Sequence, residues 1–390
     1  MKHDWEYKKL GEISTIAAGQ GAPQGDSNYS TQGTPFIKAG NLIDLINGID
    51  ENNIQKVTED VAKSHKLRLY PSGSILFAKS GMSCMKGYVY TTKNDCYVVS
   101  HLAIVIPTKI NASYLNFFLQ VKKPNSLVKD EAYPSISLKD ISDIEVPYPT
   151  KGQQTAIVSE LDTLSGIITE CKETLKDYDA LEQSIFYDMF GDPVKNDKGW
   201  EVKKLEDLCD KIVDCPHSTP IKSETPTRFP CIRTSELRNG EISWDSMQYV
   251  GEKEYENRIA RLQPQTDDIV FGREGSIGGA VILPEGYNFC LGQRTMLLRA
   301  NRTLIEPVFL HRVILSDWIK NQIMDKNVAS TVAHVNVKDV KAFLLPLPPL
   351  SLQQQFASKI EAIEQMKSET KKALQEAETL FQARMDYWFN

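Results

Sequence analysis

The sequence lacks the features that would mark a membrane protein, a disulfide scaffold or a metalloprotein. No apolar run approaches the roughly 18 residues needed to cross a bilayer, and residues 1–10 carry no signal-peptide pattern, so we expect a cytoplasmic protein. The seven cysteines are irregularly spaced, with no C-x-x-C pair, and the six histidines form no H-x-x-x-H pair. We therefore expect free, mostly buried thiols and no bound metal.

An excess of basic residues, which often accompanies nucleic-acid binding, is also missing. The formal net charge is −6. The acidity is concentrated, because residues 151–196 carry 4 Lys and Arg against 9 Asp and Glu, whereas residues 1–150 carry 16 against 15. A basic face on a larger segment is therefore compatible with the net charge, and composition by itself gives no support for DNA binding.

Recognisable catalytic motifs are absent as well. An adenine methyltransferase needs a D/N-P-P-Y/F loop for the flipped base, and the nearest string, Asp214 to His217, reads DCPH. The glycine-rich Gly272 to Gly279 is not followed by the G-K-S/T of a phosphate-binding loop. No Ser/His/Asp, Cys/His or carboxylate set is repeated in the chain. We expect no catalytic site, metal or cofactor on this chain.

What the sequence does contain is an internal repeat. WEYKKL at residues 5–10 returns as WEVKKL at residues 200–205, and SLKDISDIEVPYP at 137–149 returns as NVKDVKAFLLPLP at 336–348. A repeat of this length indicates two similar globular modules rather than a solenoid. Short β-branched runs such as SILFAKS and DDIVFGR predict strands, and 112–121 and 307–324 predict helices, so each module is expected to be mixed α/β.

Each module ends in a long helix with apolar residues at alternating steps of four and three, the pattern of a coiled-coil seam. The seam is interrupted by Glu182 in the first copy and by Lys367 and Thr370 in the second, which predicts a polar contact in mid-helix. The residues assigned to the helix-pairing or partner-binding seam are Ile157, Leu161, Leu164, Ile168, Leu175, Phe356, Ile360, Ile363, Leu374 and Phe381.

The predicted fold class is α+β, with two globular domains, two long antiparallel helices and a pseudo-two-fold repeat. The expected boundaries are domain 1 at 1–150, helix one at 151–195, domain 2 at 196–348 and helix two at 349–390. Neither helix should be stable alone, and the obvious partner of each is the other copy. The alternative is that each helix packs on its own globular domain.

This organisation resembles the specificity subunits of type I restriction–modification systems. Two segments are similar to the family's junction between a target-recognition domain and a spacer helix: VPYPTKGQQTAIVSELD at 146–162 and LPLPPLSLQQQFASKIE at 345–361. LEQSIFYDMFGD at 181–192 resembles its helix end, and GWEVKKLEDL at 199–208 its domain start. The resemblance covers essentially the whole chain. Thr150 and Gly152 depart from the family's usual junction residues without changing this outline.

The resemblance implies that each domain recognises one half of a bipartite double-stranded DNA target. It also implies that the paired helices fix the spacer and bind two adenine-methylating modification subunits, which restriction subunits then join. S-adenosylmethionine, ATP and magnesium would belong to those partners.

Polar, turn-rich loops at matched places in the two copies carry side chains suited to base edges and phosphates. For any single residue, an ordinary solvated loop is the alternative. The DNA-contacting candidates are Gln20, Gln24, Lys38, Asn41, Lys79, Ser80, Lys86, His217, Lys222, Arg233, Glu236, Arg273, Ser276 and Arg294. Two other functions stay open at this point: an enzyme with an unrecognised active site, and a scaffold that binds only protein.

Overall fold

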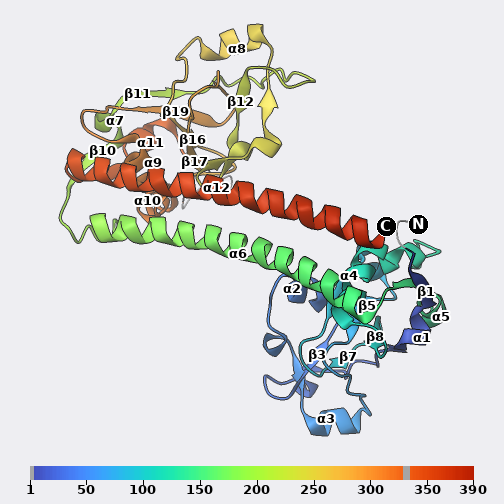
Figure 1. Ribbon diagram of the computed structural model, residues 1–390. Helices are drawn as coiled ribbons and strands as arrows, with labels where there is room; N and C mark the ends of the chain where they lie inside the picture. The colour runs from blue at the N-terminus through green and yellow to red at the C-terminus, as the bar shows by residue number, and fades with distance from the viewer. Residues whose placement is uncertain (1–3, 328–333) are drawn as a thin grey trace. The chain divides into compact units, whose positions relative to one another are not determined.

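The computed structural model describes residues 4–327 and 334–390. The chain divides into two compact units, of which unit 1 comprises residues 1–172 with 372–390 and unit 2 comprises residues 173–371. Each unit contains one globular domain together with part of each long helix, α6 (Lys151–Phe190) and α12 (Leu350–Phe389) (Figure 1).

Domain 1 is built from three small sheets. A four-stranded antiparallel sheet has the order β2-β8-β5-β6, a three-stranded mixed sheet the order β4-β3-β7, and β1 pairs with β9. The strands are β1 Glu6–Lys9, β2 Ser14–Ala18, β3 Thr34–Ile37, β4 Lys56–Val57, β5 Ile75–Ala78, β6 Val89–Thr91, β7 Tyr97–Val98, β8 Leu102–Pro107 and β9 Glu145–Tyr148. The helices are α1 Leu10–Ile13, α2 Asn41–Ile46, α3 Glu59–Ser64, α4 Ala112–Lys122 and α5 Leu138–Ser142.

Domain 2 repeats this plan. Its sheets have the orders β11-β19-β16-β17, β15-β12-β18 and β10-β20, and a further pair, β13-β14. The strands are β10 Glu201–Lys204, β11 Cys209–Asp214, β12 Pro230–Ile232, β13 Leu237–Arg238, β14 Glu241–Ile242, β15 Gln248–Tyr249, β16 Ile269–Gly272, β17 Ala280–Ile282, β18 Cys290–Leu291, β19 Thr295–Ala300 and β20 Leu344–Leu347. The helices are α7 Leu205–Leu208, α8 Glu252–Ile259, α9 Pro307–Leu315, α10 Asp317–Asn327 and α11 Val337–Lys341. The predicted repeat and mixed α/β content are confirmed.

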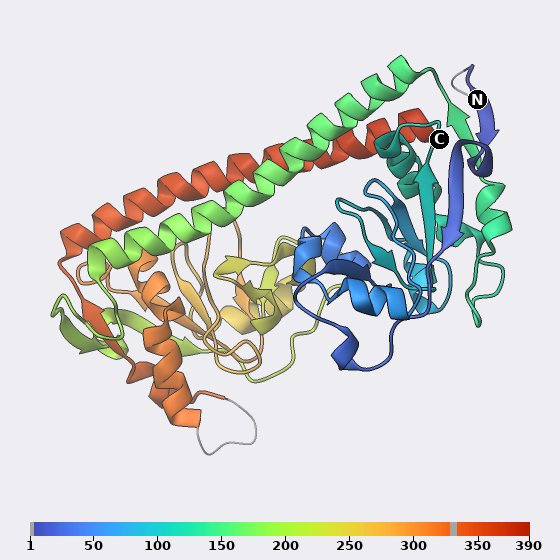
Figure 2. The ribbon, with the colours of Figure 1, turned by 90° about the horizontal axis from the view of Figure 1, so that it is seen from below.

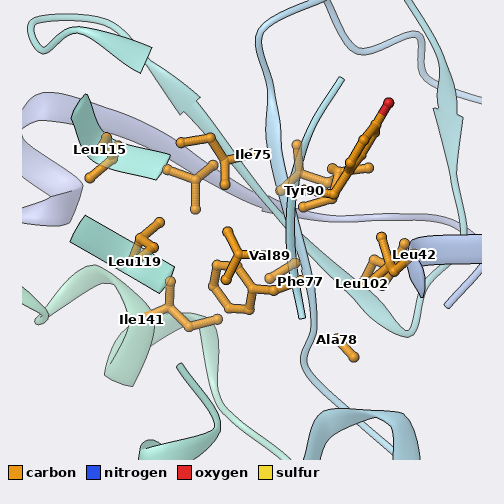
Figure 3. Close-up of a cluster of buried hydrophobic side chains, with 14 of the residues drawn as sticks. Leu42, Ile75, Phe77, Ala78, Val89, Tyr90, Leu102, Leu115, Leu119 and Ile141 are labelled. Atoms are coloured by element: carbon orange, nitrogen blue, oxygen red, sulfur yellow. The ribbon is translucent and has the colours of Figure 1, made fainter. Parts of the chain in front are cut away.

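The core of domain 1 lies between the four-stranded sheet and the helices that follow it. Phe77 of β5 and Val89 of β6 face Leu115 and Leu119 of α4, and Ile141 of α5 closes the cluster (Figure 3). These side chains are at most 5% exposed. Burying apolar side chains of this size contributes about 1.5–3 kcal/mol each, so this cluster holds the sheet that positions the loops described below.

The long helices pack both on each other and on the domains, so the two packing alternatives are combined. In unit 1, Ile157 and Leu161 of α6 are buried in the domain 1 core together with Met385 of α12. In unit 2, Phe356 and Ile360 of α12 lie in the domain 2 core with Phe186 and Phe190 of α6. Residues near the start of one helix thus meet residues near the end of the other, which confirms the antiparallel pairing (Figures 1 and 2).

The buried start of each helix corrects the view of the seam as a purely helix-pairing or partner-binding surface. Of the predicted seam, Ile157, Leu161, Phe356, Ile360 and Ile363 are at most 3% exposed. They are covered by this chain itself, because the helix begins within its own domain. The half-buried seam residues are Leu164, Ile168, Leu175, Leu374 and Phe381.

A glutamine fixes the start of each long helix to its domain. Gln154 is 1% exposed; its side-chain oxygen accepts a hydrogen bond from the backbone N–H of Asn111 at 2.9 Å, and its nitrogen donates to the carbonyl of Pro149 at 2.9 Å. Gln353, fully buried, bonds the backbone of Glu306 and Pro348 in the same way, at 2.9 and 2.8 Å. Burial of a satisfied amide sets the helix position more specifically than apolar packing alone.

Two of the polar residues that interrupt the heptad patterns, Glu182 and Lys367, meet each other in unit 2. The ammonium group of Lys367 lies 2.9 Å from the Glu182 carboxylate and 2.7 Å from that of Asp179, and Arg312 of α9 lies 2.6 Å from Glu182. The side chains of Glu182 and Lys367 are only 4% and 5% exposed. Burial lowers the pKa of Lys367, but hydrogen bonds to Asp179 and Glu182 outweigh it and the net shift is upward. The predicted polar contact in mid-helix is confirmed.

Two smaller predictions have different outcomes. The helix expected over 307–324 is in fact two helices, because the backbone of Ser316 is extended and its hydroxyl donates to the carbonyl of Val313 at 2.6 Å. The cysteines are free and mostly buried, as expected. Across the described parts of the chain, no helix is long and apolar enough to cross a membrane.

Candidate nucleic-acid interface

In domain 1, loops from five strands converge at one end of the sheets. The backbone of Gln20, after β2, bonds Val98 and Ser100, and the N–H of Val99 bonds the carbonyl of Ile37 at the end of β3. The N–H of Lys79, after β5, donates to the carbonyl of His101, before β8, at 2.9 Å. We call this end, carrying Gln20, Lys38, Lys79, Ser80 and His101, the strand-end surface of domain 1.

Domain 2 forms the same surface with equivalent backbone bonds. The N–H of Gly292 donates to the carbonyl of Ile232 at 2.6 Å, and that of Arg273 donates to the carbonyl of Arg294 at 2.9 Å. The strand-end surface of domain 2 carries His217, Arg233, Arg273, Glu274 and Arg294. Short polar loops at the ends of packed strands present side chains on a rigid frame, an arrangement suited to recognition.

Several predicted DNA-contacting side chains in domain 1 are engaged within the protein. The amide of Gln20 donates to the carbonyl of Lys66 at 2.8 Å and accepts from the N–H of Arg68. Asn41 accepts from the N–H of Lys38 at 2.9 Å, which closes the turn after β3. The Lys38 ammonium donates to Gln55 at 2.6 Å and lies 4.1 Å from the centre of the Tyr29 ring. These contacts give Gln20 and Asn41 a role in shaping the loops.

The other domain 1 candidates leave more of the side chain accessible. Gln24 and Lys86 are exposed, with Gln24 donating to the carbonyl of Ala22 at 3.0 Å. Lys79 and Ser80 are half-buried, and the Ser80 hydroxyl lies 3.0 Å from Nδ1 of His101. Lys79, Ser80 and Lys86 therefore stay candidates for DNA contact.

Glu236 corrects the prediction for domain 2. It is fully buried, and its carboxylate accepts from the N–H of Arg233 at 2.8 Å, from the Arg233 guanidinium at 2.6 Å and from the Ser235 hydroxyl at 2.8 Å. It occupies the position that Asn41 has in domain 1, closing the turn after β12. A buried carboxylate with three donors holds the loop and is not presented to a base edge.

Arg273 is neither solvated nor freely extended. It is 8% exposed; its guanidinium lies 2.8 Å from Asp214 and donates to the carbonyl of Val335 at 3.3 Å. His217, 73% exposed, approaches the same carboxylate at 3.4 Å. Ala18 is the domain 1 equivalent of Asp214, from the strand registers, so Lys79 lacks the carboxylate that neutralises Arg273.

The remaining domain 2 candidates face solvent. Lys222 and Ser276 are exposed. Arg294 is 61% exposed, and its backbone has a positive φ of 66°, a conformation that residues other than glycine adopt infrequently. Its Nε lies 3.1 Å from the Glu274 carboxylate.

Two residues of the strand-end surfaces, His101 and Glu274, and two arginines that support a loop of domain 2, Arg258 and Arg261, were not among the predicted candidates. His101 and Glu274 contact Ser80 and Arg294, respectively, and each lies close to a β-strand in the sequence. Arg258, 3% exposed, donates to the carbonyls of Leu291 and Ser218, and Arg261 donates to that of Cys215, so both brace the loop after β11. Within residues 4–327 and 334–390, no group of three or more His, Cys, Asp or Glu is placed to hold a metal ion.

A family model for the type I restriction modification DNA specificity domain matches the chain twice, over residues 2–178 and 197–379. The specificity subunit of the type I restriction enzyme MjaIX from Methanocaldococcus jannaschii is 21% identical over 383 residues, covering 92% of this chain and 87% of the relative. The EcoDI specificity subunit from Escherichia coli is 21% identical over 406 residues, covering 92% and 81%.

Solved structures share the fold. The S subunit of a type I restriction–modification system from M. genitalium aligns with a TM-score of 0.62 at 12% identity, over 98% of this chain and 95% of that one. A chain from a structure on complex assembly and conformational transition of the type I R-M system aligns with a TM-score of 0.54 at 16% identity, over 99% and 97%.

Proposed function

The chain belongs to the family of type I restriction–modification DNA specificity subunits, whose model matches both copies of its repeat. We propose a separate function for each of its two domains and for the long helices. Domain 1 recognises one half of a bipartite double-stranded DNA target and domain 2 recognises the other. The observation that carries this proposal is the strand-end surface, built twice on the same backbone frame with different side chains. One frame with two sets of side chains is what two different half-sites require.

The chain itself carries no catalytic step in this proposal. Two modification subunits methylate adenine, restriction subunits add translocation and cleavage, and S-adenosylmethionine, ATP and magnesium bind to these partners. Apolar side chains left exposed on the long helices support a partner surface, because several lie multiples of seven residues apart along one helix. They are Ile167, Leu181, Met366, Leu380 and Tyr387, each 39–49% exposed.

The test is a domain exchange. Residues 1–146, which end before α6 begins, are replaced by the corresponding segment of another family member, and methylated adenines are mapped genome-wide in a host that also expresses the modification subunits. We expect one half-site to change and the other half-site to stay the same. A change in both half-sites would contradict independent recognition by the two domains. If the complex with the unaltered chain methylated no specific sequence, the proposed DNA-recognition function would be contradicted.

A further inference from the structure

The strand-end surfaces contain one side-chain pair that occurs at the same place in both domains with different chemistry. In domain 1 the pair is Ser80 with His101, and in domain 2 it is Glu274 with Arg294. The first member follows the central strand β5 or β16, and the second precedes β8 or β19. We propose that this pair reads one base pair in each half-site, with Arg294 and His101 contacting the base and Glu274 and Ser80 positioning them. This inference rests on the proposed function.

The backbone around the pair is the same in both domains. The N–H of Lys79 bonds the carbonyl of His101 at 2.9 Å, and that of Arg273 bonds the carbonyl of Arg294 at 2.9 Å. On the other side, Ser80 forms a β-bridge with Ser135, and Glu274 forms one with His334. Since the backbone frames coincide, the two pairs leave the surface at equivalent points, and only their side chains differ.

Stability does not account for the pair. Arg294 is 61% and Glu274 34% exposed, and a solvent-exposed ion pair of this kind contributes little to stability. His101 is also exposed. Arg294 moreover adopts a positive φ, which is a small conformational cost for an arginine. A left-handed backbone conformation that presents an exposed, tethered arginine side chain is typical of a binding position.

The geometry of each pair suggests what it binds. Glu274 engages Nε of Arg294, which orients the guanidinium and leaves its two terminal nitrogens for a ligand. Two parallel N–H donors match O6 and N7 of guanine in the major groove. In domain 1, Ser80 engages Nδ1 of His101 and leaves Nε2, which supports one hydrogen bond to a base edge. We therefore expect a guanine in the half-site of domain 2 and a less stringent preference in that of domain 1.

The test selects binding sites from duplex DNA randomised in each half-site, using the full chain assembled with its modification subunits. With Arg294→Ala we expect discrimination at one position of the domain 2 half-site to fall about tenfold to a hundredfold. Glu274→Gln, which keeps the shape but weakens the tether, should lower discrimination at that same position. The double change Glu274→Ser and Arg294→His should replace the preference there with that of domain 1.

The matched control is Arg302→Ala. Arg302 is 63% exposed and pairs with Asp267 at the opposite end of the same sheet, so its loss should leave every base preference unchanged. The inference is overturned if Arg294→Ala retains the wild-type preference at all positions, or weakens binding to all sequences equally, as a phosphate contact would. The function would instead fail if the unaltered complex selected no bipartite sequence at all.

Discussion

Replacing Lys367 by methionine should destabilise unit 2 by about 3 kcal/mol, because the change removes one of the two cations, Lys367 and Arg312, that pair with the buried Glu182 carboxylate. Removing one partner of a buried ion pair typically costs about 3–5 kcal/mol. Arg312 stays 2.6 Å from Glu182 and still neutralises part of its charge. We therefore expect a loss of stability at the lower end of this range, about 3 kcal/mol. For a unit of this size, each kcal/mol shifts the melting temperature by about 2–4 °C. The expected loss is therefore about 6–12 °C.

Scanning calorimetry of the full chain, following the transition of unit 2, measures this loss. Lys320→Met is the control, because that lysine is 55% exposed and pairs with Asp317 at the surface. Changing Glu182 and Lys367 together to leucine restores an apolar seam, and Arg312 keeps Glu364 at 3.2 Å, so we expect a melting temperature near or above that of the wild type. The reasoning is refuted if Lys367→Met melts within 2 °C of the control, a margin set by about 1 kcal/mol.

Three further outcomes follow from the structure. Burial lowers the pKa of His311 to about 4, so between pH 6.5 and 4 the unfolded chain binds a proton at His311 that the folded chain does not, and unit 2 loses stability as pH falls. His311→Leu removes this proton uptake, so the melting temperature of unit 2 should fall less steeply over the same pH range. The hydrogen bond from Arg384 lowers the pKa of Glu160 below 4.5, so Glu160→Gln should lower the unit 1 melting temperature at pH 7, and this deficit should vanish as pH falls through the depressed value. Leu380→Asp should weaken assembly with the modification subunits in co-purification, whereas Leu344→Asp, on a leucine of β20 that is 44% exposed against 49% for Leu380, should not.

The duplicated architecture was predictable because repeated sequence segments and heptad spacing can be read directly from the order of the residues. The breaks in those patterns were equally informative: Glu182 and Lys367 stand out as polar residues in apolar seams, and the structure joins them. Such a pair is detectable from sequence because an uncompensated buried charge would be too costly to retain.

The recognition surface was predictable only in outline. Polar loops at repeat-matched positions did converge, but which side chains they present depends on the contacts that each side chain makes in the folded domain. Gln20 is engaged by the backbone of residues 66–68, and Glu236 is buried by its own loop, neither of which any local pattern reveals. His101 was missed because it lies between two strands. His101 occupies the repeat position equivalent to that of the predicted candidate Arg294, and this correspondence identifies it as a candidate too.

The division of the chain into units has a consequence for the order of events during synthesis. Unit 2 is one continuous segment, whereas unit 1 needs residues 372–390, which are made after all of unit 2. Within unit 1, Met385 is 4% exposed, the Trp388 ring stacks on Trp5 at 6.0 Å, and Phe389 packs on Tyr114 at 5.3 Å. At about 5–20 residues per second, the finished domain 1 segment waits roughly 10 to 40 seconds for these side chains. The amino-terminal domain is thus completed last, and a premature stop near the carboxyl end should damage domain 1 before domain 2.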